Sequence, residues 1–188
     1  MRTGAVPAIV ERGIPRAQLD RSSSVFSAPE FHFLSPAVQD MWRRHNPTTR
    51  PDLDRFERRE RSKYPFVQKL TLALSHAKVP LLVGSDASAP GLFPGQSVHT
   101  ELQELVKAGL RPEDALVAAT RTPGDFIGRH TRTVPFGTIS RGSRADMILF
   151  RRNPVEHLAN LDSLAGVMVR GRWFMTDDLK RLRTGAAR

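Results

Sequence analysis

Apolar and polar positions alternate at helical spacing in the first half of the chain. Ser35 and Pro36 begin one such stretch, with the serine as N-cap and the proline at the first helical position. Val38, Met41 and Trp42 then recur on one face. The pattern predicts a helix that ends before the Asn-Pro pair at 46–47.

A second helical pattern covers residues 52–76, where apolar residues recur at intervals of three and four between charges. Pro65 falls inside it and is expected to break or kink the helix. Upstream, the short apolar run 5–10 predicts a buried strand. Residues 12–29 are rich in Gly, Pro and Ser, which is typical of a loop or a broken helix.

The run Val79–Val83 is apolar without interruption and ends at Gly84-Ser85-Asp86. A strand without alternation is typical of a parallel sheet that helices cover on both faces. Helices are then expected over 99–108, closed by Gly109, and over 111–120. A short helix or turn is expected over 123–128.

After Phe136 the period becomes that of strands. Short strands are expected over 137–139, 145–150 and 167–169, with a tight turn at Arg170-Gly171-Arg172. The last residues, 180–188, are basic and small, and we expect them to be frayed.

Composition excludes several classes of protein. The chain has 188 residues, enough to bury a core, and 39% of them are hydrophobic. It has no cysteine, which excludes disulfides, cysteine zinc sites, iron–sulfur clusters and a thiol nucleophile. Its apolar runs are too short to span a bilayer, and residues 1–7 do not form a signal peptide. We therefore expect no membrane partner, and the cytoplasm is the favoured location.

The net charge of +10 raises the question of a nucleic-acid partner. The excess is spread over both halves of the chain, and the densest stretch, 55–63, alternates in sign as a solvated helix face does. No motif of a folded nucleic-acid reader is present, so nucleic acid is not expected. An arginine-rich, non-catalytic binding module remains the alternative from another class.

Asp86 is the candidate catalytic residue. A carboxylate at the end of a buried parallel strand lies at the edge where α/β barrels and open sheets place their active sites. The Gly/Pro-rich loop 87–98 that follows is long for such a connection. Position alone leaves a second interpretation open, in which Asp86 caps the next helix or holds a turn.

The order of motifs from residue 79 onward resembles the end of the amidohydrolase superfamily, in particular its imidazolonepropionase-like and Xaa-Pro-dipeptidase-like members. The motifs are Val79–Ala87, Pro94–Leu102, Leu105–Leu116, Ala118–Thr120, Gly137–Ile139, Gly142–Leu149, Asn153–Pro154 and Val167–Arg172. Upstream, Ala5–Val10 resembles strand seven of the family's barrel, and Phe33–Pro36 resembles the segment after it.

The resemblance implies an α/β fold: strands seven and eight of a (β/α)8 TIM barrel, with their helices, and part of a small β-sandwich. Residues 1–135 would be the end of the barrel domain, 136–178 part of the composite sandwich, and 179–188 a basic tail. The chain would then be the C-terminal part of a longer protein.

The resemblance also implies metal-dependent hydrolysis of a carbon–nitrogen bond in a small non-peptide or dipeptide-like amide. Asp86 would be the strand-eight aspartate, which binds a divalent metal, zinc in our expectation, and shuttles a proton from the attacking water. Ser85 stands where many members have threonine, and both supply a hydroxyl.

The family's other ligands are a His-x-His pair, a lysine or glutamate, and two more histidines, and none is matched here. The six histidines are isolated in the sequence. We expect two of them, His76 and His99, on helices and two, His130 and His157, in loops. His99, just past the loop after Asp86, is the least improbable site residue among them. A catalytic zinc needs about three protein ligands, so we expect the chain to be inactive alone and to require the missing N-terminal half or a second copy. A degenerate gene product remains a further alternative. The six are His32, His45, His76, His99, His130 and His157.

Overall fold

The computed structural model describes residues 25–45, 53–87 and 90–186. It begins with two short 3-10 helices, η1 (Val25–Ser27) and η2 (Pro29–Phe33), followed by helix α2 (Pro36–Arg44). The Ser35 side chain accepts a hydrogen bond from the Val38 N–H at 3.4 Å, so the predicted cap is confirmed. The strand predicted over 5–10 lies outside the described residues.

Helix α3 (Leu53–His76) is a single helix of 24 residues with Pro65 inside it. The expectation of a break at Pro65 is wrong, because the helix continues through this position. Tyr64, Val67 and Leu74 pack against the core on either side of the proline. Their burial outweighs the one backbone hydrogen bond that proline cannot make.

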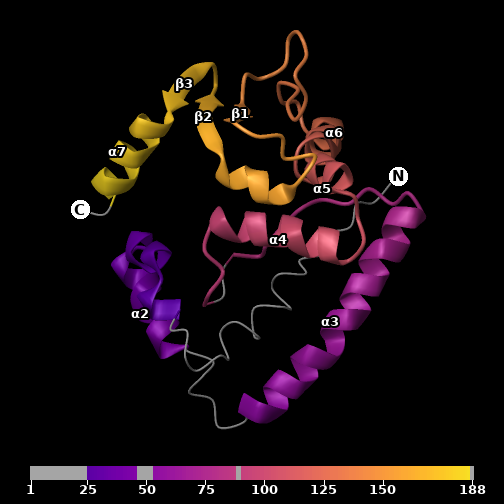
Figure 1. Cartoon of the computed structure of the whole chain (residues 1–188), viewed down its shortest axis with the longest axis vertical. Coiled ribbons are helices and arrows are strands. Elements are labelled where there is room, and N and C mark those ends of the chain that lie inside the picture. The colour runs from indigo at the N-terminus through magenta and orange to yellow at the C-terminus, as the bar shows by residue number, and fades with distance from the viewer. Residues whose placement is uncertain (1–24, 46–52, 88–89, 187–188) are drawn as a thin grey trace.

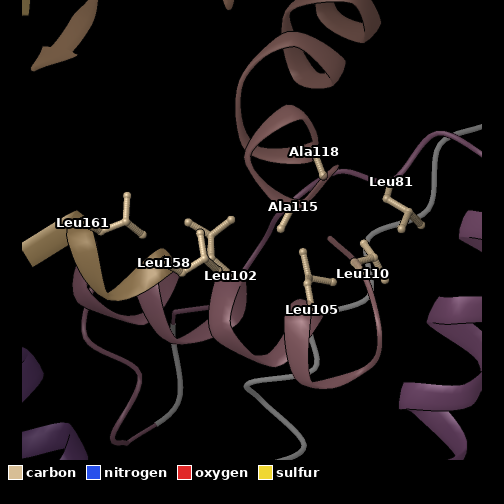
Figure 2. Close-up of a cluster of buried hydrophobic side chains, with 8 residues drawn as sticks. All are labelled: Leu81, Leu102, Leu105, Leu110, Ala115, Ala118, Leu158 and Leu161. Atoms are coloured by element: carbon tan, nitrogen blue, oxygen red, sulfur yellow. The ribbon is translucent and has the colours of Figure 1, made fainter. Parts of the chain in front are cut away.

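The core lies around helices α4 (Gln96–Lys107) and α5 (Pro112–Ala119), which are in contact, and α6 (Arg121–His130) packs on α5. Figure 1 shows α4 at the centre, with the sheet and α7 on one side of it and α3 on the other. The 3-10 helix η4 (Leu158–Asp162) packs on α4. Figure 2 shows the buried side chains that form this cluster: Leu81, Leu102, Leu105, Leu110, Ala115, Ala118, Leu158 and Leu161.

Gly109 ends α4 as predicted. Its φ is +109°, a conformation that glycine adopts without steric cost. The N–H of Gly109 donates to Val106 at 2.9 Å, and that of Leu110 donates to Leu105 at 3.1 Å. The reversal lets Leu110 fold back into the core.

The sheet has three antiparallel strands in the order β1 (Met147–Phe150), β2 (Leu164–Val169) and β3 (Arg172–Met175). Ile148 is paired with Val167, which is paired in turn with Phe174. Arg170 and Gly171 both have positive φ, +50° and +80°, as a two-residue hairpin turn of type I′ requires. The predicted turn and the strands around it are confirmed.

Three further predictions differ from the structure. Residues 137–139 form no strand, because Gly137 has a φ of +87° and the chain turns back through Ser140 and Ser143. Residues 79–83 form no regular strand either: only Leu81 makes an isolated bridge. The expected frayed tail is helical up to Ala186, within α7 (Thr176–Ala186).

The described residues therefore make an α/β fold of helices and one small antiparallel sheet. A closed barrel and a sandwich are not seen within them. None of the helices in the described part combines the length and the apolar character that a membrane span requires.

Candidate active site

The segment that leads to Asp86 leaves α3 and crosses the core. The Val79 N–H donates to Leu74 at 3.0 Å, and the Val83 N–H donates to Ala118 at 3.0 Å. These bonds tie the segment to α3 and α5. Leu81 and Ser85 are buried along it. The segment is therefore fixed up to the residue before the candidate carboxylate.

Asp86 itself is exposed, and its backbone has a φ of +50°. Aspartate tolerates this left-handed conformation better than most residues do. Because the chain reverses here, the carboxylate leaves the buried segment where solvent can reach it. The interpretation of Asp86 as a helix cap is wrong, because Gly95 is the N-cap of α4. A role in the adjoining turn remains compatible with the structure.

An aromatic cluster anchors the segment that follows Asp86. Leu92 is fully buried, and the Phe93 ring packs against Trp42 of α2 with 5.2 Å between centroids. Trp42 also packs against Phe31 at 6.1 Å between centroids, and its buried Nε1 has no hydrogen-bond partner among the described residues. The helical spacing of Val38, Met41 and Trp42 predicts an apolar face for Trp42 but not its contact with this segment.

Two buried carboxylates on α4 were also missed. Glu101 is 0% exposed, and Glu104 is buried beside α3. Glu104 accepts hydrogen bonds from the Tyr64 hydroxyl and from Lys107 Nζ, the latter at 2.7 Å. The signal in the sequence is that both acids flank Leu102 and Leu105, on the side of the helix that faces the core. Glu104 links α3 to α4.

The structure does not bring the histidines together. His76 and His99 lie in helices, as predicted, and His157 lies in a loop just before η4. His130 was expected in a loop but is the last residue of α6, where its ring packs on Phe126 at 4.8 Å. The two remaining histidines lie in η2 and at the end of α2: His32 and His45.

The donor set does not fit a catalytic metal by itself. Within the ranges described, no group of three or more His, Cys, Asp or Glu side chains could hold a metal ion. A catalytic zinc needs about three protein ligands and an open position. Asp86 alone supplies one carboxylate.

The fold of this chain is similar to that of several solved structures. A bottromycin amidohydrolase matches 99% of this chain and 41% of its own, with a TM-score of 0.71 and 25% identity. A Xaa-Pro dipeptidase with bound methionine in its active site matches 79% of this chain and 34% of its own length, with a TM-score of 0.55 and 20% identity. An ochratoxinase from A. niger matches 74% of this chain and 30% of its own length, with a TM-score of 0.54 and 22% identity.

These matches give the chain the fold of the amidohydrolase superfamily, and the resemblance seen in the motifs is confirmed. Within that fold the chain corresponds to the C-terminal part, and it spans 41% or less of the length of these three structures. No protein-family model matches the sequence, and no curated protein gives a significant match.

Proposed function

We propose that this chain forms the C-terminal part of a hydrolase that cleaves a carbon–nitrogen bond in a small amide, either a non-peptide or a dipeptide-like one. The observation that carries the proposal is the exposed carboxylate of Asp86, at the end of a fixed segment, in a fold shared over 99% of the chain with an amidohydrolase. In this proposal residues 1–135 end a (β/α)8 barrel and residues 136–178 complete a small sandwich.

Asp86 is the residue to which we assign the proton transfer. Hydrolysis adds water across the bond: its oxygen joins the carbonyl carbon, and its protons end on the products. A positioned carboxylate accepts a proton from the attacking water and returns it to the leaving nitrogen. The exposure of Asp86 gives water and substrate access to this group.

A divalent metal, zinc in our expectation, belongs to this proposal only with ligands from outside the described residues. One carboxylate does not hold a catalytic zinc, and the described part offers no cluster that completes the set. The other ligands would come from a further segment of the protein or from a partner chain.

The test is to tag the protein at its own genomic locus, purify it from its source, and assay hydrolysis of N-acyl amino acids and dipeptides. We expect turnover that Asp86→Asn abolishes while the far-ultraviolet circular dichroism stays unchanged. Asp125→Asn is the matched control, because Asp125 is an exposed aspartate on α6, far along the chain from the candidate site.

A second arm assays the 188-residue chain alone with one equivalent of zinc. We expect no turnover, and turnover here would refute the requirement for outside ligands. Full activity of Asp86→Asn in the tagged protein would refute the role of Asp86, and inactivity of that protein on all amides would refute the function.

A further inference from the structure

The chain between Asp86 and α4 contains an arm, residues 90–95, that is packed outside the main core. Leu92 in this arm is 0% exposed, and Phe93 is half-buried. Neither belongs to the core cluster of Figure 2, and neither does Trp42, whose ring lies 5.2 Å from that of Phe93 between centroids. The aromatic packing of the arm is therefore with α2 and not with the core cluster.

The backbone of the arm adds little to its support. Gly91 and Gly95 stand near its two ends, with φ of +90° and +84°, conformations that glycine adopts without steric cost. Glycine also leaves the chain its largest conformational freedom. One backbone bond joins the arm to α4, in which the Ser97 N–H donates to the Phe93 carbonyl at 3.0 Å. The position of the arm therefore depends on the side-chain contact with α2.

The segment that ends at Asp86 has a different support. The Val83 N–H donates to the Ala118 carbonyl at 3.0 Å, and Leu81 belongs to the core cluster. Pro90, at the start of the arm, follows Asp86 by four positions, and such a length of chain spans at most about 14 Å. The core thus holds the candidate carboxylate, and α2 holds the arm that begins close to it.

We infer that Trp42 is a positioning residue of the candidate site, which keeps the arm in place for substrate binding. The inference rests on the proposed amide hydrolysis. Loss of Trp42 should raise KM, because the displaced arm binds the substrate less well, and should leave kcat nearly unchanged, because the core still holds Asp86. A purely structural role predicts the reverse: fewer folded molecules lower the apparent kcat and leave KM as it was.

Hydrogen exchange of the 188-residue chain tests the support of the arm without any assay of activity. The Ser97 amide reports on the arm, and the Val83 amide reports on the segment before Asp86, because each donates one of the backbone bonds given above. We expect Trp42→Ala to raise the exchange rate of Ser97 relative to that of Val83 about tenfold or more. Trp42→Phe keeps an aromatic ring and should stay close to the unmodified ratio.

Two further variants complete this test. Trp173 is the other of the two tryptophans in the chain and lies against Gly166 of the sheet, so Trp173→Ala removes the same side chain at a place outside the arm. Phe93→Leu removes the second ring of the contact at a half-buried position, and it replaces Trp42→Ala if that variant does not fold. We expect Phe93→Leu to raise the exchange ratio and Trp173→Ala to leave it unchanged.

Kinetics of the protein tagged at its genomic locus test the role in substrate binding. With the amide that the protein hydrolyses, Trp42→Ala and Phe93→Leu should each raise KM about tenfold and keep kcat within about twofold. Trp42→Phe should restore the KM of the unmodified protein. Trp173→Ala should change neither constant.

Each other outcome overturns a defined part of the inference. An unchanged exchange ratio of Ser97 to Val83 refutes the support of the arm by Trp42, whatever the activity. A raised ratio with an unchanged KM, or a lower kcat at constant KM, refutes the role in substrate binding, and the proposed function stands if Asp86→Asn is inactive. Absence of hydrolysis by the unmodified tagged protein refutes the proposed function and with it the role in substrate binding, and the exchange ratio then describes packing alone.

Discussion

The ring of Phe93 packs against the ring of Trp42 with 5.2 Å between centroids and 52° between planes. Phe93 belongs to the segment that starts at Asp86, and Trp42 belongs to α2, so one aromatic contact joins two parts of the chain that are distant in sequence. The position of this segment depends on α2.

Substitutions at Trp42 should separate packing from hydrogen bonding. Trp42→Ala removes a side chain that is 2% exposed and should cost about 3–5 kcal/mol. Trp42→Phe keeps an aromatic ring and removes the unpartnered indole N–H, so its cost should stay below about 1.5 kcal/mol. Urea unfolding of the chain measures both. Equal losses for the two variants would contradict this account.

Two glycines of α6 should respond in opposite ways to alanine. A Cβ at Gly124 would lie 2.0 Å from the Phe136 carbonyl oxygen, so Gly124→Ala should cost at least about 2 kcal/mol. A Cβ at Gly128 meets nothing within 4 Å, and Gly128→Ala should stabilise the helix by about 0.5–1 kcal/mol. The free energies of unfolding of the two variants test this prediction. A lower stability of Gly128→Ala than of the unmodified chain would contradict it.

Replacing two prolines at helical positions with alanine should also change stability by different amounts. Pro65 is exposed inside α3, so Pro65→Ala restores a backbone donor and should raise stability by about 1–3 kcal/mol. Pro112 is at the first position of α5, where no intrahelical bond is lost, so Pro112→Ala should be nearly neutral. Thermal unfolding compares them, and the idea fails if both variants shift the midpoint equally.

Asp146 should contribute to the loss of stability in acid. The Arg170 backbone N–H, 2.7 Å from its carboxylate, holds the pKa of Asp146 below its ordinary value of 3.8, and Arg144 adds to the effect. The ionised form therefore favours the folded state above the ordinary pKa, and this contribution is lost as pH falls through the lowered pKa.

Asp146→Asn should accordingly make the acid loss shallower below about pH 4. Stability measured against pH by urea unfolding checks this. Asp114→Asn is a useful comparison, because a hydrogen bond from Arg111 lowers the pKa of Asp114 in the same direction. A profile for Asp146→Asn as steep as that of the unmodified chain would show that Asp146 contributes nothing.

The features that sequence predicted correctly depend on local backbone rules. Ser35 caps α2 and Gly109 ends α4, because each satisfies backbone groups within its own turn. The failures occur where distant segments compete for the backbone. Gly137 approaches Thr120 instead of joining a strand. The helix α7 was missed although Asp177 and Asp178 mark its first turn.

The candidate site was predictable only in part. The motif order identified Asp86, whereas its positive φ results from how the chain leaves the core. Glu101 and Glu104 could be found only from the side of α4 on which they lie. The contact of Trp42 with Phe93 joins distant residues, and no spacing pattern encodes it. The remaining site ligands have no counterpart among the described residues.

The close approach of α6 to the segment after it bears on how this sequence can diverge. A Cβ at Gly124 would meet the Phe136 carbonyl, and a Cβ at Gly137 would lie 2.3 Å from the Thr120 carbonyl. Each of these two positions therefore admits only glycine, because a side chain there would clash with backbone that is distant in the sequence. Relatives that keep this contact must retain both glycines together, even where the arginines around them have been replaced.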